Sequence, residues 1–160
     1  MFVRDIATRN VVSCLPETDL ASASALFWEH DCGILPVVDR ARRVVGVLTD
    51  RDICMALATR GKLASQLCAR DVMSHDVHTA LEEDAIGSAL KALRQHRVRR
   101  LPVVDGEGRL KGLLSMNDLV LAARPDPGAI PSYEDVVHVM KAICAHSPEA
   151  ARAKGQLALA

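Results

Sequence analysis

Short runs of apolar residues alternate along the chain with stretches in which apolar residues recur every three or four positions. The runs at 34–39 and 44–48 are separated by a polar turn, and so are the runs at 100–105 and 110–114. Two such runs joined by a short polar turn are typical of a β-hairpin, so the pattern predicts two hairpins. Helical spacing before each hairpin predicts a helix. The residues that carry this spacing are Leu20, Ala23 and Phe27, and then Ile86, Leu90 and Leu93.

Further elements are predicted ahead of each hairpin. Val11-Val12 and Val77 predict a short strand before each of these helices. Thr18 and Asp84 stand just before the helical spacing begins, and side chains of this kind accept hydrogen bonds from free N–H groups at a helix start. We therefore expect Thr18 and Asp84 to cap the two helices.

A second helix is predicted after each hairpin. Thr49 and Ser115 stand at the expected N-caps, and the helices should run to about Ala58 and Ala123. Each half of the chain then has the order β-α-β-β-α. This order places the protein in the α/β class.

The two halves are copies of one another. When residues 4–56 are written above residues 70–122, an offset of 66 positions with no gap, 18 of the 53 aligned residues are identical. The sequence LPVVD stands at 35–39 and again at 101–105. An internal repeat of this kind indicates two copies of one supersecondary unit. One unit alone leaves an apolar sheet face uncovered, so we expect the copies to pack together.

The repeat suggests the domain boundaries. We expect a first repeat at 1–60, a linker at 61–68 and a second repeat at 69–123. The proline-rich sequence RPDPGAIPS predicts a loop at 124–131. Ser132 would cap a C-terminal helix at 132–146 with an apolar side, and the alanine-rich tail at 147–160 is expected to be flexible.

The composition argues against several classes of protein. Twenty basic and 20 acidic residues give a net charge of zero, so the chain has no global field that would attract nucleic acid. Four aromatic residues are too few for a surface on which single-stranded bases stack. No apolar stretch predicts a membrane helix, and the first residues do not resemble a secretory signal. Five scattered cysteines without a C-x-x-C pair indicate reduced thiols, and neither a disulfide framework nor a zinc site.

The same short motif ends both hairpins. G-x-x-[T/S]-x-x-D occurs at 46–52 and at 112–118, each time behind an LPVVD strand. With these motifs, residues 3–123 resemble a tandem pair of cystathionine-β-synthase-type (CBS) domains, often called a Bateman module. The resemblance implies two pseudo-symmetric repeats that pack through their sheets and enclose two clefts. It also implies that an adenosine compound (AMP, ADP, ATP or S-adenosylmethionine) binds as a regulatory ligand, and that the module is not an enzyme.

The resemblance implies roles for particular residues. Asp52 and Asp118 would accept hydrogen bonds from ribose hydroxyls, and Thr49 and Ser115 would contact phosphate or ribose at a helix start. Without the resemblance, the same residues would be interpreted as N-caps and favourable first-turn charges. The residues implied to contact adenine are Ile34, Val47, Thr79 and Leu113.

The two repeats differ where the charge of a phosphate would be met. Arg99 and Arg100 precede the second LPVVD, and the resemblance implies that such a basic pair is directed at phosphate. The first repeat has Gly33 and Ile34 at these positions and offers Arg51 instead. We therefore expect one cleft to take a phosphorylated ligand and the other a neutral adenosyl group or none. The alternative is that the arginine pair is an exposed edge without a partner.

Three further signals have simple interpretations. Residues 91–111 carry seven basic and two acidic residues, an excess of five charges, but no interleaved aromatic rings. We interpret this stretch as a phosphate-binding or solvated face. His75 and His78 are interpreted as a surface pair and not as a metal site, because their H-x-x-H spacing is not on a predicted helix. Cys32 stands near the expected cleft but has no neighbour that would activate its thiol.

The sequence thus predicts a cytoplasmic regulatory module. A ligand between the repeats would favour one conformation and signal to a separate protein partner, which the sequence does not identify. We expect a homodimer, sealed in part by the C-terminal helix, and Mg²⁺ only together with a triphosphate. Two alternatives remain open at this point. One is a ligand-free scaffold, and the other is a nucleic-acid-binding protein that uses residues 91–111.

Overall fold

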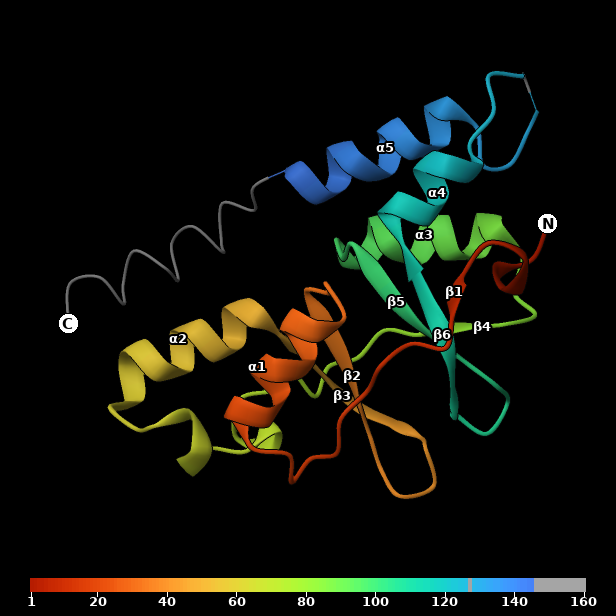
Figure 1. Ribbon diagram of the computed structural model, residues 1–160. Coiled ribbons are helices and arrows are strands. Elements are labelled where there is room, and N and C mark those ends of the chain that lie inside the picture. The colour runs from red at the N-terminus through yellow and green to blue at the C-terminus, as the bar shows by residue number, and fades with distance from the viewer. Residues whose placement is uncertain (127, 146–160) are drawn as a thin grey trace.

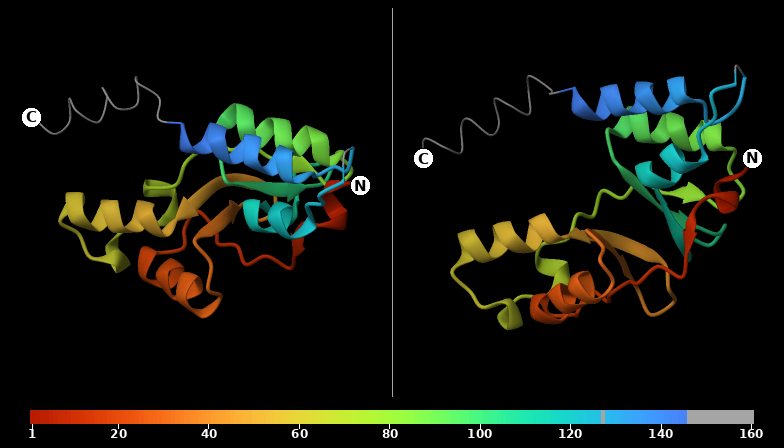
Figure 2. Two further views of the ribbon diagram at one scale, coloured as in Figure 1. Left: turned by 90° about the horizontal axis from the view of Figure 1, so that it is seen from above. Right: turned by 45° about the horizontal axis from the view of Figure 1, so that its top comes forward.

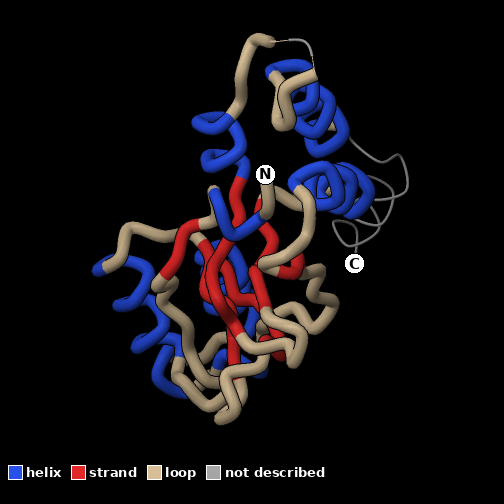
Figure 3. Tube along the Cα trace, turned by 90° about the vertical axis from the view of Figure 1, so that its right-hand side faces the viewer, coloured by secondary structure: helices blue, strands red, loops and turns tan. Residues whose placement is uncertain are grey.

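The computed structural model describes residues 1–126 and 128–145 of the 160-residue chain. Two mixed α/β units lie side by side (Figure 1), and the strands gather in the middle with helices around them (Figure 3). The elements are β1 (Thr8–Arg9), α1 (Leu20–Glu29), β2 (Ile34–Val38), β3 (Val44–Thr49), α2 (Asp50–Arg60), β4 (Ala80–Leu81), α3 (Ile86–His96), β5 (Arg100–Val104), β6 (Leu110–Ser115), α4 (Met116–Ala122) and α5 (Tyr133–Cys144), with 3-10 turns at Val3–Asp5, Ala64–Gln66 and Ala69–Asp71.

Both predicted hairpins are present and have the same register. Ile34 pairs with Thr49 in the β2–β3 hairpin, and Arg100 pairs with Ser115 in the β5–β6 hairpin. Each hairpin also has one irregularity in register, between Val37 and Val38 in the first and at the matching place in the second. The equal registers confirm that the two halves are structural as well as sequence repeats.

The predicted strands at Val11-Val12 and Val77 are absent from the described structure, so this prediction is wrong. Extended pairing occurs on either side of these valines. Cys14 pairs with β2, and its counterpart Ala80 pairs in parallel with β5. Upstream, β1 pairs antiparallel with β6, which belongs to the other repeat. The four-stranded sheet therefore has the order β1-β6-β5-β4, and β2 and β3 form a two-stranded sheet.

The segments that begin the two repeats are exchanged between them. The N–H of Val3 donates to the carbonyl of Asp84 at 2.8 Å, and the N–H of Ala69 donates to the carbonyl of Thr18 at 2.8 Å. Val47 and Ser74 exchange two backbone hydrogen bonds of 3.0 and 2.9 Å, the counterpart of the pairing between β1 and β6. Residues 2–9 therefore pack on the second repeat, and residues 67–74 pack on the first.

Each repeat has its own apolar core, completed by the segment of the other. Leu35 and Leu48 are fully buried in the first core, and their counterparts Leu101 and Leu114 are fully buried in the second. The N-terminal Val3 is fully buried in the second core. Residues 67 and 69–73 supply the exchanged side chains of the first core, which are Leu67, Ala69, Val72 and Met73.

The glycines of the G-x-x-[T/S]-x-x-D motifs let the exchanged segments approach the hairpins. A Cβ at Gly112 would lie 2.6 Å from the carbonyl oxygen of Thr8. A Cβ at Gly46 would lie 2.6 Å from Sδ of Met73 and 3.1 Å from the carbonyl oxygen of Ser74. The first residue of the motif is therefore glycine because another backbone passes at that point.

The helix starts agree with prediction after the hairpins but not before them. Thr49, Ser115 and Ser132 are N-caps, and each accepts a hydrogen bond from the backbone N–H three residues on. Thr18 and Asp84 are not caps. Thr18 accepts from the N–H of Leu15 and Asp84 from the N–H of Leu81, so both stabilise the turn before the helix. Asp19 caps α1, and the N-cap of α3 makes no side-chain hydrogen bond.

The C-terminal helix lies alongside α3 and contacts α4 (Figure 2). Its residues Val136 and Val139 are buried in the second core. The predicted tail at 147–160 falls outside the described residues. Across the described ranges, we find no helix with both the length and the apolar character needed to cross a membrane.

Candidate functional site

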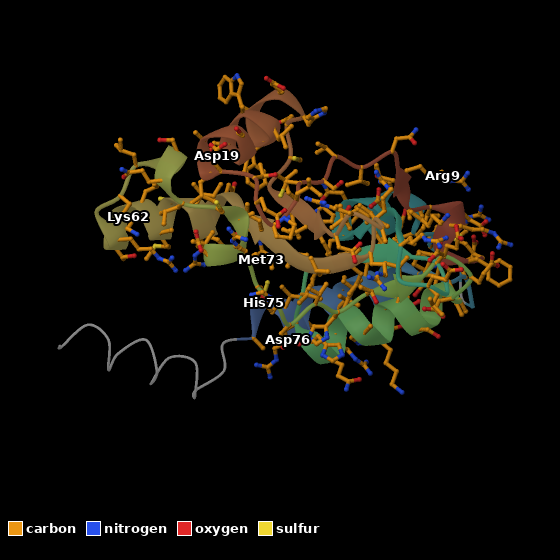
Figure 4. All side chains as sticks on the ribbon, turned by 90° about the horizontal axis from the view of Figure 1, so that it is seen from below. Arg9, Asp19, Lys62, Met73, His75 and Asp76 are labelled. Atoms are coloured by element: carbon orange, nitrogen blue, oxygen red, sulfur yellow. The ribbon has the colours of Figure 1, made fainter. Side chains whose placement is uncertain are left out.

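One cleft between the repeats is lined by residues from both of them. Its volume is about 260 Å³, just below the range usual for small-molecule sites. Figure 4 labels Met73, His75 and Asp76 along the segment that leads from the first repeat to this cleft. The lining residues are Ile34, Val47 and Thr49 from the first repeat, and Asp76, Val77, His78, Val98, Arg99, Arg100 and Pro102 from the second.

The first repeat contributes the N-terminus of α2 to the cleft. The Thr49 hydroxyl accepts from the N–H of Asp52 at 3.2 Å and donates to Asp52 Oδ2 at 2.6 Å. The backbone N–H of Thr49 donates to the same oxygen at 2.9 Å. These reciprocal bonds form a capping box. Thr49 lines the cleft but Asp52 does not, so the structure separates these two predicted contacts.

The second repeat contributes two guanidinium groups. Arg99 is exposed and Arg100 is half-buried. A Cβ at Gly33 would lie 3.9 Å from Nη2 of Arg100 and 3.6 Å from Oδ2 of Asp50, so Arg100 reaches the first repeat. Within residues 1–126 and 128–145, no carboxylate lies within 4.0 Å of either guanidinium. Two guanidinium groups that form no ion pair within the described residues therefore line the cleft together with Thr49, and Asp50 Oδ2 is the acidic atom near Arg100 at the start of α2.

The matching positions of the second repeat are arranged differently. Asp118 Oδ2 accepts hydrogen bonds of 2.7 and 2.6 Å from the N–H and hydroxyl of Ser115. Its Oδ1 accepts a further hydrogen bond of 3.2 Å from the hydroxyl of Thr8 in β1. Both carboxylate oxygens of Asp118 therefore have protein partners. In the described part of the chain, Oδ1 of Asp52 has none.

Of the remaining residues predicted to contact the ligand, some line the cleft and others do not. Ile34 and Val47 line the cleft as apolar walls, as the resemblance implies. Thr79 is exposed and follows the lining segment without joining it. Leu113 lies in β6, where it pairs with Thr8 of β1, and it does not line this cleft. Arg51 is exposed on α2 and is likewise not among the lining residues.

Sequence reasoning missed the contribution of His78. The ring of this half-buried residue lines the cleft and stacks on His96, with centroids 3.5 Å apart and an interplanar angle of 19°. The H-x-x-H spacing indicates instead that His78 forms a surface pair with His75. The alignment of the repeats contained a signal, because His78 replaces Val12 on the otherwise apolar segment before the first helix. In the part of the chain that the structure describes, no three His, Cys, Asp or Glu side chains gather as a metal site.

Cys32 is not an activated thiol. Burial raises the pKa of the Cys32 thiol, and this effect outweighs the opposing influence of a hydrogen bond from Ile34 and the charge of Arg100. The side chain faces a groove between α1 and α2 and not the cleft. The interpretation of Cys32 as an unreactive residue agrees with this environment.

The basic residues of 91–111 do not form one surface. Lys91 and Arg94 face a cavity between α3 and α5, while Arg99 and Arg100 face the cleft. Arg109 pairs with Glu107, and Lys111 Nζ lies 3.4 Å from Asp105 Oδ2. The charge excess is therefore divided among three places.

Known proteins with similar sequences span a range of lengths. The uncharacterized protein MK0525 of Methanopyrus kandleri is 30% identical over 118 residues, which cover 74% of this chain and 60% of that protein. The CBS domain-containing protein YhcV of Bacillus subtilis is 29% identical over 136 residues, which cover 85% of this chain and 95% of YhcV. The chain thus spans about three fifths of the first relative and nearly all of the second.

Solved structures with this fold include two that hold adenosine compounds. The CBS domain pair of protein MJ0100, in complex with 5′-methylthioadenosine and S-adenosyl-L-methionine, superposes with a TM-score of 0.67 at 25% identity, over 76% of this chain and 94% of that one. CBSX2 in complex with AMP superposes with a TM-score of 0.66 at 29% identity, over the same shares of the two chains.

The family model of the CBS domain matches the chain twice, at residues 3–59 and 69–125. These ranges coincide with the two copies found by the internal repeat. The hairpin and the two helices of each copy lie within the matched ranges, apart from Arg60 at the end of α2. The chain therefore belongs to the CBS domain family, of which it carries a tandem pair.

Proposed function

We propose that the chain binds a phosphorylated adenosine compound in the cleft at Thr49 and Arg100, and that binding regulates a separate protein. The observation that carries this proposal is the meeting, in one cleft, of Thr49 with two guanidinium groups that form no ion pair among the described residues. Arginine forks favour phosphate oxygens. The N–H groups of Arg51 and Asp52 at the start of α2 already donate to Asp50 and Thr49, so the two guanidinium groups carry the phosphate assignment. A neutral adenosyl group would supply no anion to either guanidinium group.

The proposal assigns a role to each part of the cleft. Arg99 and Arg100 hold the phosphate, and the Thr49 hydroxyl is proposed to turn from Asp52 Oδ2 to donate to a phosphate oxygen. Ile34 and Val47 cover the base. Oδ1 of Asp52, which has no partner among the described residues, is proposed to accept from a ribose hydroxyl that extends beyond the lining of the cleft, because Asp52 is not one of the lining residues. Mg²⁺ enters only with a triphosphate, as the counterion of its additional charges.

The second side of the repeat interface is proposed to hold no phosphate. Gly33 and Ile34 stand where the arginine pair would be, and Thr8 occupies the free oxygen of Asp118. We therefore propose one phosphorylated ligand per chain. The bound adenosine compounds of MJ0100 and CBSX2 support an adenosine ligand as the general class.

The regulatory step is proposed to be a change in the angle between the repeats. The lining residues come from both units, so a bound ligand stabilises the arrangement in which they close on it. The chain is proposed to act as a homodimer and to pass this change to a separate protein.

Isothermal titration calorimetry with AMP and adenosine tests the proposal, supported by thermal unfolding with ADP, ATP and S-adenosylmethionine. We expect AMP to bind more tightly than adenosine. The double substitution Arg99→Met and Arg100→Met should weaken the binding of AMP about a hundredfold and leave the binding of adenosine unchanged. Arg40→Met, at an exposed turn between β2 and β3, is the matched control and should change neither.

Two results would overturn parts of the proposal. Equal binding of AMP and adenosine, unaffected by the arginine substitutions, would contradict the phosphate assignment. A ligand at one hundred times its dissociation constant raises stability by about 2.7 kcal/mol, which thermal unfolding detects easily. If no adenosine compound raises the unfolding temperature at millimolar concentration, the chain is a ligand-free scaffold.

A further inference from the structure

An apolar stripe on the outer side of α5 is uncovered. Tyr133, Val137, Met140 and Cys144 recur at intervals of four, three and four residues, so they lie on one side of the helix. The first three are 57%, 52% and 38% exposed, and Cys144 is also exposed. Val136 and Val139, by contrast, are buried against the second core. We call the four exposed residues the outer α5 stripe.

A second uncovered apolar surface lies on the first repeat. A groove of about 310 Å³ runs between α1 and α2 and is lined by Ser24, Phe27, Trp28, Cys32, Asp50 and Ile53. Trp28 is the single tryptophan of the chain, and it is 89% exposed. We call this surface the α1–α2 groove. Together with the apolar lining of the groove, the exposed ring forms a contiguous apolar patch, and patches of this kind mark interaction sites.

The repeat relationship connects the two surfaces. Phe27 and Ile53 of the groove correspond to Leu93 and Leu119 of the second repeat. In the second repeat these two leucines belong to the core cluster that α5 covers with Val136. The helix α5 therefore occupies, on the second repeat, the place that is open on the first. Because α5 is held against α3 and α4, it lies away from α1 and α2 of its own chain (Figure 1). It is therefore not the helix that covers the groove between them.

We propose that the outer α5 stripe of one copy seats in the α1–α2 groove of a second copy, and that a twofold axis repeats this contact. The inference rests on the homodimer of the proposed function and names its surfaces. Each α5 would then pack between the second repeat of its own chain and the first repeat of the partner. One contact, made twice, covers both of the uncovered apolar surfaces, as a twofold interface requires.

The charges along the helices favour an antiparallel arrangement of α2 and the incoming α5. The helix α2 begins with Asp50 and ends with Arg60. The helix α5 begins with Glu134 and carries Lys141 in its last turn. In the antiparallel arrangement, the partner's Lys141 lies toward Asp50, which lines the groove. Unlike charges then meet at the start of α2, and the dipoles of the two helices are opposed.

The fluorescence of Trp28 can report the formation of the dimer in the wild-type protein. We expect light scattering to give twice the 17.3 kDa of one chain. In the dimer, Trp28 emission should be blue-shifted and protected from quenching by iodide, because α5 of the partner covers the ring. Dilution through the dissociation constant should shift the emission to the red in step with the fall in mass.

Two substitutions remove one surface each. Val137→Glu places a charge on the outer α5 stripe, and Trp28→Arg places in the groove the residue that stands at its counterpart, Arg94. Each change occurs twice in a twofold dimer and should raise the dimer dissociation constant about a hundredfold. Leu81→Glu, at an exposed leucine of β4 outside both surfaces, is the control and should leave the dimer intact.

Mixing the two variants distinguishes the proposed pairing from its alternative. One intact groove and one intact stripe then face each other, so the mixture should form a mixed dimer tighter than either variant alone. If Val137→Glu separates the dimer but Trp28→Arg does not, the helices α5 pair with each other and the groove assignment is wrong. A dimer in which Trp28 stays exposed also contradicts the inference. A monomer at all concentrations would overturn both the inference and the proposed homodimer, whereas the ligand titration tests the cleft separately.

Discussion

The two repeats have matching buried cores, but they differ in the residues at their rims, that is, at the positions that border the cleft. Leu35 and Leu48 have identical, fully buried counterparts, and both hairpins end in a hydroxyl and an aspartate that form a capping box. At the rim, the second repeat has His78, Arg99 and Arg100 where the first has Val12, Gly33 and Ile34. Identical positions therefore maintain the fold, and positions that differ are where specific binding is to be sought.

The largest expected effect tests whether the two cores are equivalent. Leu48→Ala and Leu114→Ala each remove a fully buried side chain from matching places and should each cost about 2–5 kcal/mol of unfolding free energy. Urea denaturation measures both. Because the exchanged segments connect the cores, we expect a single transition in each variant. A second transition in either curve would show that the repeats unfold independently.

A smaller loss of unfolding free energy is expected when the two motif glycines are replaced. Gly112→Ala drives a methyl group toward the carbonyl oxygen of Thr8, which belongs to a paired backbone, and should cost about 1–3 kcal/mol. Gly46→Ala meets the flexible side chain of Met73 first, so it should cost less. The same urea measurements decide the order. Equal costs would mean that Met73 has no room to move.

The two helix caps separate stability from binding. Thr49→Ala and Ser115→Ala should each cost about 1 kcal/mol, because each removes the side chain that accepts the third N–H of its helix. Only Thr49→Ala should also weaken the binding of AMP measured by calorimetry. Thr49→Ser should restore both the stability and the binding of AMP. If Ser115→Ala weakens AMP equally, the second side of the interface binds the ligand as well.

The smallest effect concerns Asp39 and its counterpart Asp105 in the two hairpin turns. Hydrogen bonds from the backbone N–H of Arg43 and of Arg109, 2.9 Å each, lower the pKa of the two carboxyl groups below the ordinary value. A lowered folded pKa contributes stability that is present above the unfolded pKa, about 4, and is lost as the pH falls through the folded pKa.

Carbon-13 NMR titration of the carboxyl groups should give similar, low midpoints for Asp39 and Asp105. Asp39→Asn and Asp105→Asn should each reduce the loss of stability in acid, as measured by thermal unfolding between neutral pH and acid. A midpoint at the ordinary value for one residue would show that its turn is not formed like the other.

Local sequence patterns predicted the hairpins and the helices that follow them. The repeated LPVVD and the hydroxyl residues Thr49 and Ser115 act through neighbours in the chain, so their effects are visible in the sequence. The N-caps before α1 and α3 were misplaced for a related reason. The side chains of Thr18 and Asp84 accept hydrogen bonds from backbone N–H groups three residues earlier in the chain. A sequence pattern does not show which of two adjacent turns such a side chain will stabilise.

The exchange of segments was not predictable in the same way. Val11-Val12 has the composition of a strand, but the extended pairing falls on Thr8 and Arg9, where β6 of the other repeat is available. Partners more than one hundred residues apart leave no local pattern, and tertiary contacts override strand propensity. For the same reason, the interpretation of His78 as a surface residue failed, because the walls of the cleft come from both repeats.

The exchange also bears on how a duplicated chain of this kind arises. A single repeat with this geometry would lack the hairpin on which its first segment lies and the segment that its own hairpin needs. Two separate copies would satisfy each other by trading these segments, since the contacts of residues 2–9 and 67–74 are reciprocal. Gene fusion of such a swapped dimer would yield the tandem chain without the loss of a contact. The contacts between two separate molecules would then become contacts within a single chain.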